Sequence, residues 1–251
     1  MAPVSTLARR GVLDVLVTLR DYAIVTYAVE PDALARQLAP GFTPQMFVLA
    51  DGRQCALVSA VVFTDVDFRW RALGWPRFRF GQTNYRAYVQ YGGRDVVWFL
   101  GTTLATRFVA IPRLLWQMPW HRVRMQFDCR WDGERCESFG MTARGPWGAA
   151  ELTARGSTVG IGVLEGVASI EQAQRLLTHP TEGYFRRTRD GTIATYTIDH
   201  APLVLQRATE VHARFDVFER LGLVAPSAVP HSVLLQRSTD YAIHLPPRRL
   251  S

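Results

Sequence analysis

Lysine is absent from this sequence. All 29 basic residues of the 251-residue chain are arginine. An iminium with a carbonyl substrate requires a primary amine, so Schiff-base catalysis by a lysine side chain is excluded. The formal charge of +7 is compatible with a nucleic-acid partner, but the arginines are spread along the chain and no known nucleic-acid-binding motif occurs. We therefore expect no nucleic-acid partner.

Long apolar runs and paired cysteines are also missing. No segment approaches the ~18 apolar residues of a membrane span. The apolar stretch 11–19 is short, contains Asp14 and lacks a small-residue cleavage site, which argues against a signal peptide. Cys55, Cys129 and Cys136 have no CxxC or metal-ligand spacing and predict free thiols in a reducing compartment. These absences predict a cytoplasmic protein with no membrane partner.

The sequence lacks the common motifs of catalysis and of cofactor or metal binding. There is no GxSxG, no P-loop and no dinucleotide fingerprint. The histidines at 200, 212, 231 and 244 form no HxH or HxxxH pair, the spacings that place two metal ligands on one face. We expect no cofactor and no metal.

What the sequence does contain is a series of strand and hairpin signals. Asp-Gly and Gly-Gly pairs supply the positive φ angles of tight turns, and they occur at residues 51–52, 92–93, 132–133 and 190–191. Segments rich in β-branched and aromatic residues, or with alternating polarity, flank these turns. The predicted strands are 22–29, 45–49, 55–67, 83–90, 96–100, 123–130, 135–143, 184–189, 192–199 and 232–245.

Helix signals are sparse by comparison. Capping and periodicity predict short helices at 32–38, 106–117, 169–178 and 216–221, with Pro112 expected to interrupt the second. Many hairpin-spaced strands with so few helices predict a mainly β protein, either an antiparallel barrel or a curved sandwich. No linker is evident, so we expect a single domain over 1–251, with its core at about 20–248 and an N-terminal extension at 1–20.

Three stretches carry a family resemblance. Residues 22–41 form a predicted strand followed by a PxxLxxxLxPG phrase, residues 84–89 read NYRAYV and precede VWFL at 97–100, and residues 233–245 form the closing strand. Together they resemble the YqjF-like family, DUF2071, over roughly residues 22–248. That family is similar to the acetoacetate decarboxylase-like superfamily. The resemblance implies a closed antiparallel β-barrel with an internal pocket and a few short flanking helices.

The resemblance also indicates where a reactive group is expected. In the decarboxylases a buried lysine pair follows a proline, after a helix that leaves a strand. The matching positions here are Trp120 and His121, after Pro119. Since histidine transfers protons near neutral pH, His121 is the first candidate for an acid–base residue. The alternative is a histidine at a strand start that donates a hydrogen bond to a backbone carbonyl.

A second candidate group lies on the strand predicted at 83–90. Alternation places Asn84, Arg86 and Tyr88 on one face. A guanidinium binds carboxylates in a bidentate manner, so this face could hold a carboxylate or a carbonyl oxygen. The alternatives are that the face points to solvent, or that Arg86 pairs with a structural acid such as Asp65 or Asp67.

Three tryptophans, Trp98, Trp116 and Trp120, cluster in the same part of the chain. They could form the wall of an apolar substrate-binding cavity. Aromatic clusters also occur simply as core packing, and the sequence leaves both interpretations open.

These observations predict a barrel that binds a small carboxylate or carbonyl compound. If the protein is an enzyme, we expect a lyase or isomerase, such as a decarboxylase, dehydratase or cyclase. It would transfer protons without a covalent amine adduct, with His121 as acid–base and Arg86 and Asn84 holding the oxyanion. One alternative is a non-catalytic ligand-binding or sensing module, and another is an interaction protein whose barrel is filled with side chains. A monomer and a homodimer are both compatible with the sequence.

Overall fold

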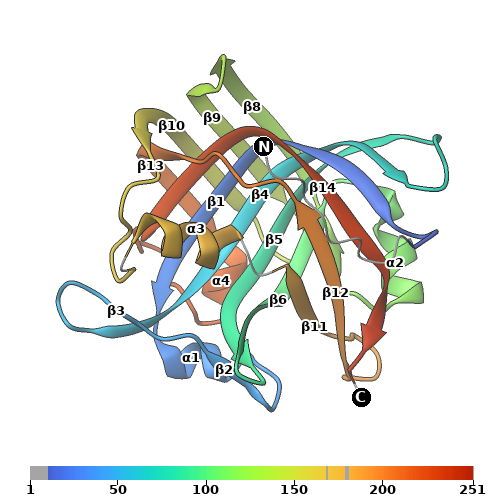
Figure 1. Cartoon of the computed structure of the whole chain (residues 1–251), viewed down its shortest axis with the longest axis horizontal. Coiled ribbons are helices and arrows are strands. Elements are labelled where there is room, and N and C mark those ends of the chain that lie inside the picture. The colour runs from blue at the N-terminus through green and yellow to red at the C-terminus, as the bar shows by residue number, and fades with distance from the viewer. Residues whose placement is uncertain (1–10, 168, 179–180, 251) are drawn as a thin grey trace.

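Seven strands close into a barrel in the computed structural model, which describes residues 11–167, 169–178 and 181–250. Residues 1–10, half of the predicted N-terminal extension, lie outside the described residues. Strand β14 pairs with β12 on one side and with β1 on the other, which closes the ring (Figure 1). In order around the barrel the strands are β1 (Val15–Val29), β4 (Gln54–Trp70), β5 (Phe78–Tyr91), β6 (Arg94–Leu104), β11 (Glu182–Arg186), β12 (Ile193–His200) and β14 (Ser232–Arg249).

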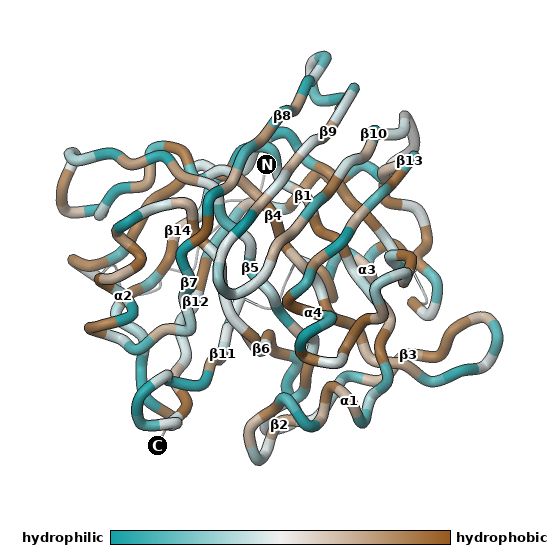
Figure 2. Tube along the Cα trace, turned by 180° about the vertical axis from the view of Figure 1, so that it is seen from behind, coloured by the Kyte–Doolittle hydropathy of each residue, from teal (hydrophilic) through white to brown (hydrophobic). Residues whose placement is uncertain are grey.

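A second layer of strands covers one side of this barrel. It leaves the barrel where β13 (Gln206–Phe215) pairs with β14, and it continues through β10 (Ala150–Gly160), β9 (Arg135–Arg144) and β8 (Arg124–Asp132). Figure 2 shows these four strands from behind, crossing in front of β1 and β4. The main hydrophobic core lies between the two layers and joins Ala23 and Val25 of β1 to Phe139 and Leu152 of the outer layer.

Strands β1 and β4 are therefore buried on both faces. Along β1, Ala23 and Val25 belong to the core under the outer layer, whereas Tyr22 and Ile24 belong to a second core inside the barrel. The same double burial explains the uninterrupted buried run of residues 55–65 in β4, which hides the alternation expected of a strand covered on one face only.

Short helices and strands complete the fold. Helix α3 (Ile170–Thr178) packs its apolar face onto the core inside the barrel. Helix α2 (Ala110–Leu115) lies on the other side of the molecule, as Figure 1 shows. The remaining elements are α1 (Pro31–Ala35), α4 (Asp216–Arg220), β2 (Phe42–Pro44), β3 (Phe47–Val48), β7 (Trp120–Arg122) and a 3₁₀ turn at Arg107–Val109. Among the described residues, no helix has the length and apolar character that crossing a bilayer requires.

The prediction of a mainly β barrel with a few short helices is confirmed, and all four predicted turns connect paired strands. The helix predicted at 106–117 is shorter, because the 3₁₀ turn occupies its start and it ends at Leu115. Two pairings, β6–β7 and β6–β11, are parallel rather than antiparallel. Strands β10 and β13 were not predicted, because they contain few β-branched or aromatic residues, no Asp-Gly or Gly-Gly pair adjoins them, and Gly156 interrupts β10.

Candidate functional site: a barrel cavity with an unpaired guanidinium

A cavity occupies the barrel interior. It encloses about 900 Å³ of empty space, counting the part that opens to solvent. Most of its wall is apolar and comes from β1, β4, β12 and β14, with the end of α3 and the segment before β7 completing it. Its polar groups come from several elements: Gln82, Asn84 and Arg86 alternate inward on β5, and Asp65 of β4 faces the same space. Tyrosines and a histidine, Tyr22, Tyr196, His200 and Tyr241, line it from β1, β12 and β14.

Asn84 is fixed in this polar row by two neighbours. Its Oδ1 accepts a hydrogen bond from Gln82 Nε2 at 2.8 Å and another from Thr102 Oγ1 at 3.0 Å. Both contacts use the oxygen of the amide. The Asn84 nitrogen is thereby oriented as a hydrogen-bond donor for a group in the cavity.

Arg86 is the cation of the cavity. Its Nη2 donates to the Tyr88 hydroxyl at 3.1 Å and to the Leu177 carbonyl of α3 at 2.7 Å. Its Nε is buried and has no hydrogen-bond partner. Within the described part of the chain no carboxylate lies within 4 Å of the Arg86 guanidinium; Asp67, one of the acids considered as its partner, instead pairs with Arg69 and Arg77. A guanidinium stays protonated in proteins, so the cavity contains a positive charge without a counter-charge.

A hydroxyl network holds this guanidinium in place. The Tyr88 hydroxyl is 2.8 Å from Ser59 Oγ, which is 2.9 Å from Thr26 Oγ1, and Ser59 and Thr26 are fully buried. Tyr22 and Tyr241 lie nearby and share a hydrogen bond between their side chains. Burial raises the pKa of both these tyrosines, so they face the cavity as neutral hydroxyl groups.

Asp65 is a functional candidate that the sequence did not identify beyond a suggested pairing with Arg86. Its side chain is 2% exposed, and its Oδ2 has no hydrogen-bond partner. Burial raises the pKa of this carboxyl well above its usual value, which favours its neutral form. The only local signal for it was an acid at the end of a long apolar strand. Buried ionisable groups with strongly perturbed pKa values cluster at functional sites.

His121 lies on the opposite face of the barrel wall. In β7 the Trp120 side chain lines the cavity, and the next residue alternates outward, where the His121 ring stacks on Trp147 at 4.0 Å between centroids. Burial, together with the charges of Arg113 and Arg220, lowers the pKa of His121 to about 4. The structure therefore does not bring His121 together with Arg86 and Asn84.

The remaining predicted site residues have different environments. Trp120 lines the cavity, and Trp116 lines a neighbouring apolar hollow. Trp98 belongs to the main core, where its ring lies 4.9 Å from that of Phe42. Tyr88 is fully buried and supports Arg86 through its hydroxyl.

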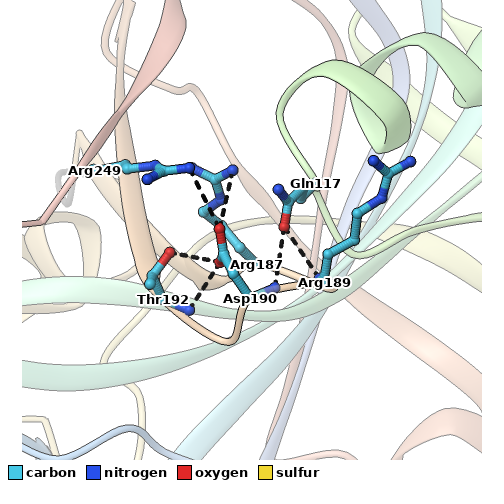
Figure 3. A network of polar contacts seen from close by, with 6 residues as sticks. All are labelled: Gln117, Arg187, Arg189, Asp190, Thr192 and Arg249. Carbon is cyan, nitrogen blue, oxygen red and sulfur yellow. Dashed lines mark hydrogen bonds and ion pairs between the residues drawn. The ribbon is translucent and has the colours of Figure 1, made fainter.

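The segment before β7 is anchored by a polar network (Figure 3). Gln117 has a positive φ of 56°, and its Oε1 accepts backbone hydrogen bonds from Arg189 and Asp190. The Asp190 carboxylate in turn accepts from Thr192 and pairs with Arg187 and Arg249. This network fixes the chain just before two cavity-lining side chains, Met118 and Trp120.

Histidines and acids do not gather into a metal site in the described part of the chain, where no group of three or more His, Cys, Asp or Glu could hold an ion. One histidine has a structural position instead. His244 of β14 contacts Asp14 through Nδ1 at 3.1 Å and Asp199 of β12 through Nε2 at 2.9 Å. It thus ties the last strand of the barrel to its neighbours.

The model of DUF2071, described as an uncharacterized conserved protein, matches residues 17–240. The chain belongs to the DUF2071 family. No curated protein matches this DUF2071 chain.

Solved structures similar to the DUF2071 chain include an enduracididine biosynthesis enzyme and acetoacetate decarboxylases. The enduracididine biosynthesis enzyme MppR complexed with pyruvate has a TM-score of 0.67 at 15% identity, covering 100% of this chain and 95% of MppR. Acetoacetate decarboxylase from Legionella pneumophila subsp. pneumophila str. Philadelphia 1 has a TM-score of 0.66 at 11% identity, covering 100% and 92%. An acetoacetate decarboxylase-like enzyme from Sphingomonas wittichii RW1 has 0.63 at 12%, covering 99% and 97%. At these identities the likeness shows the fold alone.

Proposed function

We propose that this DUF2071 barrel binds an organic acid or carbonyl compound, with a negatively charged or polarised oxygen of the ligand on Arg86. The observation that carries the proposal is the guanidinium without an ion-pair partner among the described residues, in a mostly apolar cavity. Leaving a buried charge without a partner costs stability, and a bound carboxylate supplies the missing partner through a bidentate contact. The amide of Asn84 is placed to donate a further hydrogen bond.

The similar structures support the class of ligand. MppR was solved with pyruvate, which is both a carboxylate and a carbonyl compound. This chain lacks lysine, so its ligand is held without an iminium bond to a lysine side chain.

Asp65 is the proposed acid–base group of the same cavity. Because burial favours the neutral form of its carboxyl, it can donate a proton to a ligand atom and later recover one. In the β4–β5 ladder Ser59 pairs with Arg86 and Asp65 pairs with Phe80. Asp65 therefore lies six residues from the level of Arg86, roughly 20 Å along the strand, and a ligand that meets both groups is elongated. The chemistry that suits this arrangement is the proton transfer of a lyase or isomerase, a role that we assign to Asp65 because His121 faces away from the cavity.

A ligand screen tests the binding proposal. Small carboxylates, keto acids and matched alcohols are added to the wild type and to Arg86→Met, and melting temperatures are compared. A ligand at about 100 times its dissociation constant adds about 2.7 kcal/mol to the free energy of unfolding. We expect acids to stabilise the wild type and not Arg86→Met.

The matched control is Arg94→Met, which also removes one positive charge but at an exposed position outside the cavity. Arg94→Met should keep the full response to acids. Equal responses of Arg86→Met and the wild type would overturn the proposal.

A further inference from the structure

A second hollow adjoins the cavity. It encloses about 540 Å³, again counting the part open to solvent, and Thr106 is the one polar residue type among its lining side chains. Its walls include Phe78, Phe80, Leu104, Val109 and Trp116. We refer to this hollow as the apolar annex.

The annex and the main cavity share part of their walls. Phe68, Trp120 and Leu245 line both spaces. A single ligand passing these three side chains would therefore occupy both spaces, with its polar end in the cavity and its other end in the annex.

The rim of the annex exposes apolar side chains to solvent. Phe108 is 51% exposed and Ile111 is 40% exposed, and both line the annex. Inside, the buried core at this place is small, and Phe68, Phe78 and Trp120 around it are only partly buried. A ligand group that covers these carbons gains the free energy of removing apolar surface from water. Among the described residues, no charged side chain lines the annex, so it offers no counter-charge to an ionised group.

We propose that the annex binds the apolar tail of the ligand whose acid group sits on Arg86, so that the ligand is an amphipathic long-chain acid. The inference rests on the proposed function for the position of the head group. Phe80 of the annex lies six residues from Arg86 on β5, roughly 20 Å along the strand. The apolar side chains of β1, β12 and β14, including Leu19, Ile198 and Ile243, continue the path between the two ends.

Isothermal titration calorimetry with a chain-length series tests the proposal. The probes are butanoate, octanoate and dodecanoate, each below the concentration at which it forms micelles, with dodecanol as the uncharged probe. The affinity of the wild type should rise about two- to fourfold for each added methylene once the tail enters the annex. Equal affinity for butanoate and dodecanoate would overturn the inference.

Two surface variants on α2 separate the annex from general surface effects. Ile111→Asp places a charge on the annex lining and should weaken dodecanoate binding at least tenfold while leaving butanoate unchanged. Leu114→Asp is the matched control, since Leu114 is 60% exposed on the same helix and does not line the annex. Equal dodecanoate affinities for the two variants would contradict the inference, and Phe108→Asp repeats the test at a second rim position if either variant melts early.

The uncharged probe distinguishes failure of the inference from failure of the proposed function. If dodecanol binds the wild type and Arg86→Met with equal affinity but binds Ile111→Asp more weakly, the result supports tail binding in the annex independently of the head group. If dodecanoate also binds Arg86→Met as tightly as the wild type, the proposed role of Arg86 is wrong while the annex stands. If butanoate binds through Arg86 and longer acids bind no more tightly, the proposed function stands and the inference about the annex is wrong.

Discussion

The two faces of the barrel wall formed by β5, β6 and β7 differ in whether they contain a buried charge that no opposite charge balances. On the outer face, Tyr85 and His121 both pack against Trp147, and a Cβ added to Gly101 would lie 2.3 Å from the same ring. On the inner face, the described residues give Arg86 no counter-charge and leave its buried Nε without a partner. Sequences agree with their fold at nearly every level except at functional sites. The comparison therefore assigns packing to the outer face and ligand binding to the inner one.

The largest effect on stability is expected from removing a large aromatic side chain that packs on the outer face. Phe218 of α4 is fully buried and meets Tyr85 and Phe215 with ring centroids 5.4 Å and 6.2 Å away. Phe218→Ala should lower the free energy of unfolding by about 3–5 kcal/mol, measured by urea denaturation. If the outer face is packing alone, ligand affinity well below the melting temperature stays the same. A large loss of ligand affinity in the folded variant would show that the outer face also contributes to ligand binding.

The next effect has the opposite sign and belongs to the inner face. Asp65→Asn should raise the free energy of unfolding at neutral pH by about 1–3 kcal/mol, because it removes a buried carboxyl that favours the unfolded state. The pKa of Asp65 is raised in the folded protein. Its contribution to stability is thus fully present below the ordinary pKa of an aspartate and is lost as pH rises through the folded value. The gain of the variant should vanish in acid, and a variant less stable than the wild type at neutral pH would show that the carboxyl is structural.

A smaller effect tests the contacts of His244, which join β14 to Asp14 and to Asp199 of β12. Burial alone would lower the pKa of His244, but hydrogen bonds to Asp199 and Asp14 raise it above its usual value. The stabilisation is fully present below the ordinary pKa of histidine and is lost as pH rises through the raised folded value. The wild type should lose about 1–2 kcal/mol relative to His244→Gln over this window, as followed by chemical denaturation at each pH. If the free energies of unfolding of the two proteins change with pH in the same way, the ion pairs of protonated His244 do not stabilise the fold.

The smallest effect is expected at His121. His121→Phe keeps a flat ring on Trp147 and should leave ligand binding unchanged and stability within about 0.5 kcal/mol at neutral pH. Because the folded pKa of His121 is lowered to about 4, the stability it contributes is present above its ordinary pKa and is lost as pH falls toward 4. The variant should lack that acid loss. If the variant binds ligand at least tenfold more weakly than the wild type, His121 contributes to ligand binding after all.

Part of this site could be predicted from the sequence. The alternation of residues 84–88 correctly predicted that Asn84 and Arg86 share a face with Tyr88, because a strand has a fixed period of two. The position of His121 depended on where β7 starts, and a shift of one residue exchanges the two faces of a strand. With Trp120 facing inward, His121 faces outward.

Other features had no local signal. Asp65 is buried inside the barrel by strands that are distant in sequence, such as β12 and β14, so its burial could not be inferred from its neighbours along the chain. The annex likewise combines residues of β1, β4, β5 and α2 with Leu245 near the end of the chain. These features arise from tertiary contacts, which residue patterns within one segment do not encode.

The most direct test of the account is a crystal structure of the protein with an acid whose tail carries a bromine atom, located by its anomalous signal. The account predicts the carboxylate about 2.7–2.9 Å from the Arg86 guanidinium, within the barrel and on the face that carries Asn84. A carboxylate bound elsewhere, on the arginine-rich surface or on the outer face beside His121, with the barrel cavity empty, would contradict it.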